Sequence, residues 1–197
     1  SGAGGDDIFT GYRRHYAINQ EKYWRFLPLP IRRGIREVFS LGKNYAPVFR
    51  RLYKAFAYAH YSEIHRLVSY FYWLDPSLLD TLLSDNIKET LEGYHPSLPL
   101  LETVAQLDPN VDPVNKMLYI ENKHFLTDHN LNYTDKMSMA YGVEVRVPLL
   151  DRKLVDFVAT LPVNLKQKGR VGKYIFKKSM ESLLPKNVIY RPKTGFG

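Results

Sequence analysis

The stretch Ser1-Gly2-Ala3-Gly4-Gly5-Asp6-Asp7 is a glycine-rich loop that leads into an expected helix. Three glycines in five residues allow positive φ angles and let a ligand approach the backbone closely. The free N–H groups at the start of a helix can hold an anion. A carboxylate beside phosphate oxygens requires a divalent cation between them, so Asp6 is a candidate Mg²⁺ ligand. A tight turn and helix capping by Asp6 and Asp7 are the alternative interpretation.

Downstream of this loop the apolar residues recur at helical spacing. The pattern predicts helices over 31–41, 48–58, 64–73 and 77–83, separated by prolines. Asp75-Pro76 is a helix start, with Asp75 as N-cap and Pro76 at the first helical position. Further helices are expected over 114–129, 152–160 and 172–184. Residues 143–147 alternate β-branched positions before Pro148, which predicts a short strand or an extended segment.

Two further stretches carry charged residues among apolar ones. Buried charges need partners, so the first stretch predicts an internal ion-pair network of Asp135, Lys136, Glu144, Arg146 and Asp151. Its methionines, Met137 and Met139, are expected to fill the core. The second stretch carries Gly172-Lys173 at the start of an expected helix, where a lysine suits phosphate contact; a solvated basic loop is the alternative.

Composition excludes several classes of function. The 197 residues contain no cysteine, which rules out disulfides, thiolate metal sites and a cysteine nucleophile. No segment has the length of apolar sequence that crosses a membrane or the order of a secretory signal, so a cytoplasmic protein with no membrane partner is expected. The formal charge of +8 lies largely in scattered basic pairs, typical of solvated helix faces, and no nucleic-acid-binding signature accompanies it.

Taken in order, three motifs resemble the synthetase domain of glutamine-dependent asparagine synthetases. The first is SGAGGDDIFTGY at residues 1–12. The second is DKMSMA leading to EVRVPLLD, at residues 135–151. The third is Gly172-Lys173 followed by Leu184-Pro185 and the tail 191–196. The resemblance runs from the first residue to the last.

The resemblance implies ATP-dependent amide formation with Mg²⁺. Aspartate would be activated on its side-chain carboxylate as an acyl-adenylate, and ammonia derived from glutamine would displace AMP. Ser1 and Gly2 would contact the nucleotide, Asp6 would hold Mg²⁺ with the pyrophosphate, and Lys173 would neutralise charge on the phosphates. The implied partners are therefore ATP, the carboxylate and ammonia, and a homodimer is a candidate assembly.

The resemblance also implies that residues 1–197 are the C-terminal portion of a synthetase domain. Neither the S-G-G-x-D-S loop of ATP pyrophosphatases nor the glutaminase domain with its terminal cysteine occurs in this sequence. The parent fold would be α/β, of the adenine-nucleotide α-hydrolase type, with most strands of its parallel sheet upstream. This chain would then be a mainly α fragment, inactive alone and prone to self-association through uncovered apolar surface.

Ala3 departs from the family pattern, because asparagine synthetases often carry a Glu there that is linked to adenylate formation. Alanine has no acid–base group, which leaves two alternatives open. One is an amidotransferase acting on another carboxylate, such as a sugar or natural-product precursor. The other is a catalytically idle module that binds a partner.

Overall fold

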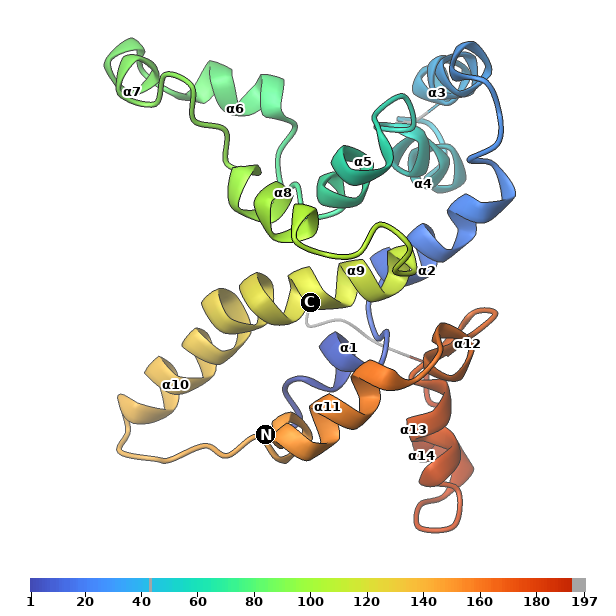
Figure 1. Cartoon of the computed structure of the whole chain (residues 1–197), viewed down its shortest axis with the longest axis vertical. Helices are drawn as coiled ribbons and strands as arrows, with labels where there is room; N and C mark the ends of the chain where they lie inside the picture. Colours follow the sequence, from blue (N-terminus) through green and yellow to red (C-terminus); the bar gives the residue numbers. More distant parts are fainter. Residues whose placement is uncertain (43, 193–197) are drawn as a thin grey trace. The chain divides into compact units, whose positions relative to one another are not determined.

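The computed structural model describes residues 1–42 and 44–192, which are mainly helical (Figure 1). These residues form two compact units. The first contains Ser1–Tyr16 and the described residues from Leu118 onward, and the second is Ala17–Met117. Most of the tail motif at 191–196 lies outside the described residues.

The first unit holds the glycine-rich loop and the C-terminal helices. Its longer helices are η2 (Glu121–Leu131), a π-helix, followed by α10 (Asn132–Met139) and α11 (Arg152–Thr160). The shorter elements are α1 (Gly5–Ile8), η3 (Pro148–Leu150), α12 (Val163–Lys166), β1 (Gln167–Lys168), β2 (Val171–Gly172), α13 (Tyr174–Ser179) and α14 (Lys186–Ile189). Two helices, α2 (Arg13–Gln20) and α9 (Pro113–Ile120), continue from one unit into the other.

The second unit is helical throughout its regular structure. Its elements are η1 (Glu21–Tyr23), α3 (Leu29–Gly42), α4 (Pro47–Phe56), α5 (Glu63–Ser69), α6 (Pro76–Leu82), α7 (Asp85–Thr90) and α8 (Leu98–Ala105). Its expected helices are confirmed in position, although α4 and α5 end earlier than predicted. The Asp75 side chain accepts a hydrogen bond from Ser77 N at 3.0 Å with Pro76 at the first helical position, so that predicted start is confirmed.

In the C-terminal half of the first unit, some elements predicted from the sequence are confirmed and others are wrong. The helix expected over 152–160 is confirmed as α11, capped by Asp151, whose carboxylate accepts from Lys153 N at 3.0 Å. The strand alternative for 143–147 is wrong, because these residues pair with no other strand in the described chain. The only described sheet is the antiparallel pair β1–β2, in which Gln167 faces Gly172. Because of this pairing, the helix that was expected to begin at residue 172 begins at Tyr174.

A small core joins the glycine-rich loop to the C-terminal helices of the first unit. Ile8, Phe9 and Val158 are buried, and the Phe9 and Phe176 rings stack with centroids 5.1 Å apart. Partly buried apolar side chains from η3, α11 and α13 surround them. The burial of this apolar surface places α1 against α11 and brings α13 to the same side.

The predicted ion-pair network of residues 135–151 is wrong. Glu144 and Arg146 pair at 3.1 Å but are both exposed, and Asp151 caps α11 instead. Met137 and Met139 are 64% and 57% exposed, so they do not fill the core. The segment lies on the surface of its unit, where water satisfies the charges and no partner is needed.

No helix in the described part of the chain is long and apolar enough to cross a membrane.

Candidate active site

Gly4 shapes the turn that presents the two aspartates. Its φ of 87° is left-handed, and its carbonyl accepts hydrogen bonds from Asp7 N and Ile8 N, both at 3.0 Å. A Cβ at Gly4 would lie 2.3 Å from the Leu150 side chain. The glycine therefore satisfies both the backbone conformation and the close packing against η3.

Asp6 and Lys173 meet although 166 residues separate them in sequence. Lys173 Nζ lies 3.1 Å from Asp6 Oδ1, and both side chains are 27% exposed. The lysine is held there by its own backbone, since Lys173 N donates to Phe9 O at 2.7 Å and its φ is 55°. The structure thus brings together two of the four site residues predicted from sequence and leaves them open to a ligand.

Ser1 and Gly2 lie on the exposed first part of the same loop. Ser1 Oγ accepts a hydrogen bond from Ala3 N at 3.2 Å, which orders the turn. No atom lies within 4 Å of the place where a Cβ on Gly2 would stand. The backbone at Gly2 is therefore free to approach a ligand, which fits the nucleotide contact predicted for it.

Glycines also allow the close contacts around Asp6 and Lys173. Gly11 N donates to Asp6 O at 2.8 Å, and a Cβ on Gly11 would lie 1.6 Å from Asp6 Oδ1. A Cβ on Gly172 would lie 2.1 Å from Thr10 O, a backbone atom. The side chain of Asp6 and the strand before Lys173 can take these positions only because both neighbours are glycine.

Replacing Gly172 with alanine is expected to destabilise the chain by about 1–3 kcal/mol, since the Thr10 carbonyl must move to make room. The control is Gly34→Ala, in the interior of α3, where no atom lies within 4 Å of the new Cβ. That substitution is expected to stabilise by up to about 1 kcal/mol through helix propensity. Thermal unfolding followed by circular dichroism measures both. Equal transition temperatures for the two variants would contradict the close contact.

The residues around Asp6 fit one kind of magnesium site. In residues 1–42 and 44–192 no group of three His, Asp or Glu side chains gathers as a metal cage. Mg²⁺, however, is commonly held by one or two carboxylates together with phosphates and water. Asp6 can supply such a single, partly exposed carboxylate, whereas Asp7 is 1% exposed and turned into the protein.

Asp7 belongs to a buried polar cluster behind the loop. Its Oδ1 accepts from Tyr12 OH at 3.4 Å and from Asn130 Nδ2 at 3.3 Å. Burial raises the pKa of the Asp7 carboxyl above 3.8, and the carboxylates of Glu121 and Asp6 raise it further. The cluster therefore ties α1 to η2 through a group that is costly to ionise.

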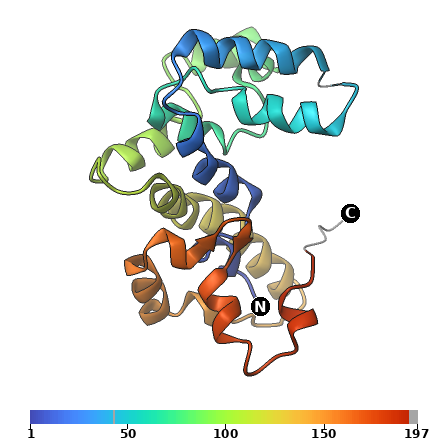
Figure 2. The same cartoon turned by 90° about the vertical axis from the view of Figure 1, so that its right-hand side faces the viewer.

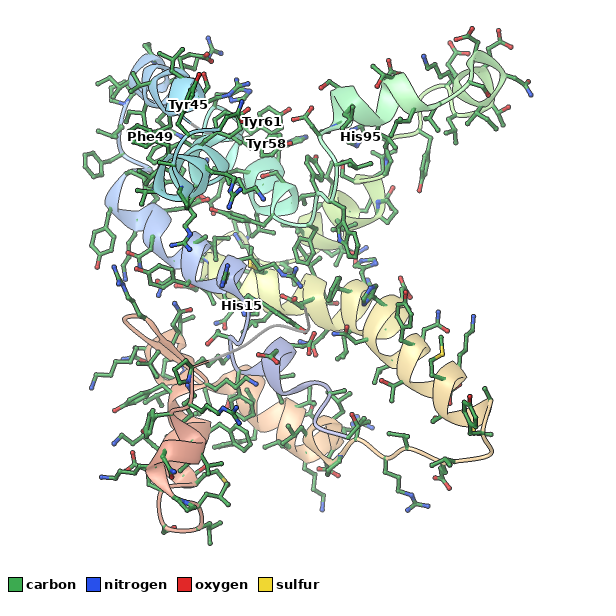
Figure 3. The ribbon with its side chains drawn as sticks, turned by 180° about the vertical axis from the view of Figure 1, so that it is seen from behind. His15, Tyr45, Phe49, Tyr58, Tyr61 and His95 are labelled. Carbon is green, nitrogen blue, oxygen red and sulfur yellow. The ribbon has the colours of Figure 1, made fainter. Side chains whose placement is uncertain are left out.

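Glu121 forms the second part of this cluster. It is fully buried, pairs with Arg14, and lies 2.5 Å from His15 Nε2 through Oε2. His15 (Figure 3) accepts from Tyr12 N at its Nδ1, 3.3 Å away, which leaves the proton on Nε2 for Glu121. The Arg14 guanidinium also lies over the Tyr12 ring at 4.6 Å.

No role was predicted from the sequence for Glu121, Arg14 or His15. A signal was present, because Val114, Met117 and Leu118 are buried at helical spacing and Glu121 occupies the next position of that face. A glutamate on an apolar helix face requires a buried partner. Which residues supply it, Arg14 and His15, depends on the packing of α2 against η2.

We expect Asp7→Asn to stabilise the chain at neutral pH, because the amide keeps its size and removes a charge that burial disfavours. A carboxyl whose folded pKa is raised penalises folding above that pKa, and the penalty vanishes below the unfolded value of 3.8. The transition temperature should therefore rise by about 2–4 °C, the effect of 1 kcal/mol in a chain of this size, at pH 7. The gain should fade as the pH falls towards 3.8. A gain that does not depend on pH would contradict this assignment.

The chain belongs to the asparagine synthase family, whose profile matches residues 1–197. This is a family of ligases of the amidotransferase type, so the predicted family is confirmed. Asparagine synthetase [glutamine-hydrolyzing] 1 of Bacillus subtilis is 33% identical over 112 residues, covering 55% of this chain and 18% of that protein. The putative asparagine synthetase of Mycobacterium tuberculosis H37Rv is 27% identical over 199 residues, covering 100% of this chain and 29% of that protein.

The Gallus gallus asparagine synthetase is 38% identical over 65 residues, which are 32% of this chain and 12% of that protein. This chain thus spans less than a third of the length of the relatives it matches. No solved structure matches it. The α/β fold expected for the parent domain stays a prediction.

Proposed function

We propose that this chain is the C-terminal portion of the synthetase domain of a glutamine-dependent, asparagine synthetase-type enzyme. The observation that supports this most is the contact between Lys173 and Asp6, at 3.1 Å, beside a loop whose backbone is open at Gly2. A cation and a carboxylate side by side at a glycine-rich loop suit a triphosphate that arrives with a divalent cation.

In the proposed reaction, an oxygen of the substrate carboxylate attacks the α-phosphorus of ATP and pyrophosphate leaves. Ammonia then attacks the activated carbonyl carbon, AMP leaves, and the amide forms. Lys173 neutralises charge on the phosphates as pyrophosphate departs, and the backbone at Ser1 and Gly2 positions the nucleotide. Asp6 would hold Mg²⁺, which supplies further neutralisation of the phosphates when bound.

Ala3 favours a second candidate, in which the acceptor is a carboxylate other than aspartate. The methyl group of Ala3 cannot take part in acid–base chemistry or bind an ammonium group. A carboxylate whose activation needs no acidic residue at this position would fit the same Lys173–Asp6 pair. The two candidates share ATP cleavage and differ only in the acceptor.

The test is pyrophosphate and AMP release from Mg-ATP and ammonium, with aspartate or with other carboxylates. It is run on residues 1–197 and on the longer protein that contains them. Release with aspartate in the longer protein supports the first candidate, and release only with another carboxylate supports the second. If the folded longer protein releases no pyrophosphate with any carboxylate, the enzyme proposal fails and the idle, partner-binding module remains.

A further inference from the structure

The antiparallel hairpin of α3 and α4 holds most of the net charge of the chain. Residues 29–56 contain seven Lys and Arg and one Glu, a formal charge of +6 out of +8. The two helices lie side by side in Figure 2, and Phe39 packs on Phe49 and Phe56 with ring centroids 5.9 and 6.2 Å apart. Part of the apolar surface of each helix is thus packed against the other helix.

Four of these cations are exposed and lack a carboxylate partner. Arg33, Arg50, Arg51 and Lys54 form no ion pair with any residue that the structure describes. Arg32 differs from them, because its guanidinium donates to the carbonyls of Leu27 and Ala59 at 2.7 and 3.0 Å. These four exposed cations make the hairpin locally positive.

Apolar side chains are exposed at the end of the same hairpin, around the turn between the helices. Val38 and Leu41 of α3 are 60% and 79% exposed, Tyr45 of the turn 90%, and Val48 of α4 60%. Figure 3 labels Tyr45 and Phe49 in this region. We call the four exposed residues Val38, Leu41, Tyr45 and Val48 the hairpin tip. Neither the packing of α3 on α4 nor the proposed active site uses them.

The distance between the hairpin tip and the cations indicates what kind of partner the hairpin binds. At 1.5 Å per residue, Arg50 and Arg51 lie about 5 Å behind the start of α4, and Lys54 about 10 Å behind it. Amphipathic segments at membranes bury their apolar side chains about 5–10 Å deep, where basic side chains meet the headgroups. From this match of apolar end and basic collar we infer that the hairpin binds the surface of an anionic phospholipid membrane.

This inference concerns peripheral binding and is independent of the proposed enzyme function. The absence of a membrane partner was predicted from the lack of a long apolar segment, which tests only for a spanning helix. A polynucleotide would also meet the cations, but it would leave the apolar tip in water. The tip therefore favours a lipid surface.

The experiment is co-sedimentation of the 197-residue chain with vesicles of phosphatidylcholine alone and of phosphatidylcholine mixed with phosphatidylserine. Binding is expected only to the mixed vesicles and should weaken as salt is added. Each basic residue near such a surface is worth about a fivefold change in affinity, so Arg50→Gln with Arg51→Gln should weaken binding about 25-fold. Leu41→Ser with Val48→Ser should weaken it as well.

The controls are Leu82→Ser on α6 and Arg152→Gln on α11, which change an exposed leucine and an exposed arginine elsewhere. They should leave vesicle binding unchanged, and circular dichroism checks that all variants keep their helices. Equal binding to neutral vesicles, no binding, or losses as large in the controls would overturn the inference. The inference would also be overturned if single-stranded RNA of equal charge displaced the protein from the vesicles. It would be overturned as well if the tip variants converted a dimer to a monomer and had no other effect.

Discussion

Lys173→Ala in the longer protein is expected to lower Mg-ATP-dependent pyrophosphate release by about 10²–10³-fold, the usual effect of removing one group that stabilises transition-state charge. The amine lies 3.1 Å from Asp6 and its backbone is anchored to Phe9, so the side chain is aimed at the loop before any ligand arrives. Because the pair is partly exposed, losing it should change the stability of the unliganded protein little.

The control for this variant is Lys168→Ala, which removes an exposed lysine from the neighbouring strand β1. Asp6→Asn should reduce the Mg²⁺ dependence of nucleotide binding, measured by titration with and without the ion. The assigned roles fail if Lys173→Ala and Lys168→Ala release pyrophosphate at the same rate. They also fail if Asp6→Asn binds Mg-ATP as the parent does.

Glu121→Ala is expected to destabilise the fold by about 3–5 kcal/mol, because it leaves the partly buried Arg14 and the fully buried His15 without their shared carboxylate. In a chain of this size, 1 kcal/mol shifts the unfolding temperature by about 2–4 °C. The expected loss is therefore roughly 6–20 °C in thermal unfolding at neutral pH.

Glu144→Ala is the matched control for that variant. Glu144 also pairs with an arginine, Arg146, but both side chains are largely exposed, at 72% and 84%. Exposed pairs contribute about 0–1 kcal/mol, so this variant should unfold within a few degrees of the parent. Similar losses for Glu121→Ala and Glu144→Ala would show that the buried cluster does not stabilise the first unit.

Local signals in the sequence predicted much of the helical structure. Asp75 and Pro76 start α6 as expected, and α11 has its predicted bounds, since capping and apolar spacing act within a few residues. The start of the helix in the segment 172–184 was not predicted correctly, because Gly172 pairs with Gln167 in the two-stranded sheet before the helix begins. Strand pairing of two residues leaves no pattern long enough to recognise.

The candidate site could also be predicted from the sequence only in part. The glycine-rich loop and its carboxylates were recognisable, as was a lysine suited to phosphate. The sequence could not show whether Asp135, Lys136 and their charged neighbours form ion pairs, because a charge pattern does not reveal which face of a segment is covered. The structure leaves them on the surface and places a different set, around Glu121, in the interior.

The sequence by itself determined the family, the helical character and the loop that carries Asp6, because each depends on residues close together in the chain. Only the tertiary structure decided that Lys173 reaches Asp6, that Arg14 and His15 share Glu121, and that the basic hairpin keeps an exposed apolar tip. These contacts join residues far apart in sequence or depend on which side chains stay uncovered. Burial of the core around Ile8, Phe9 and Val158 and packing of Phe39 between helices set such outcomes, and no local pattern encodes them.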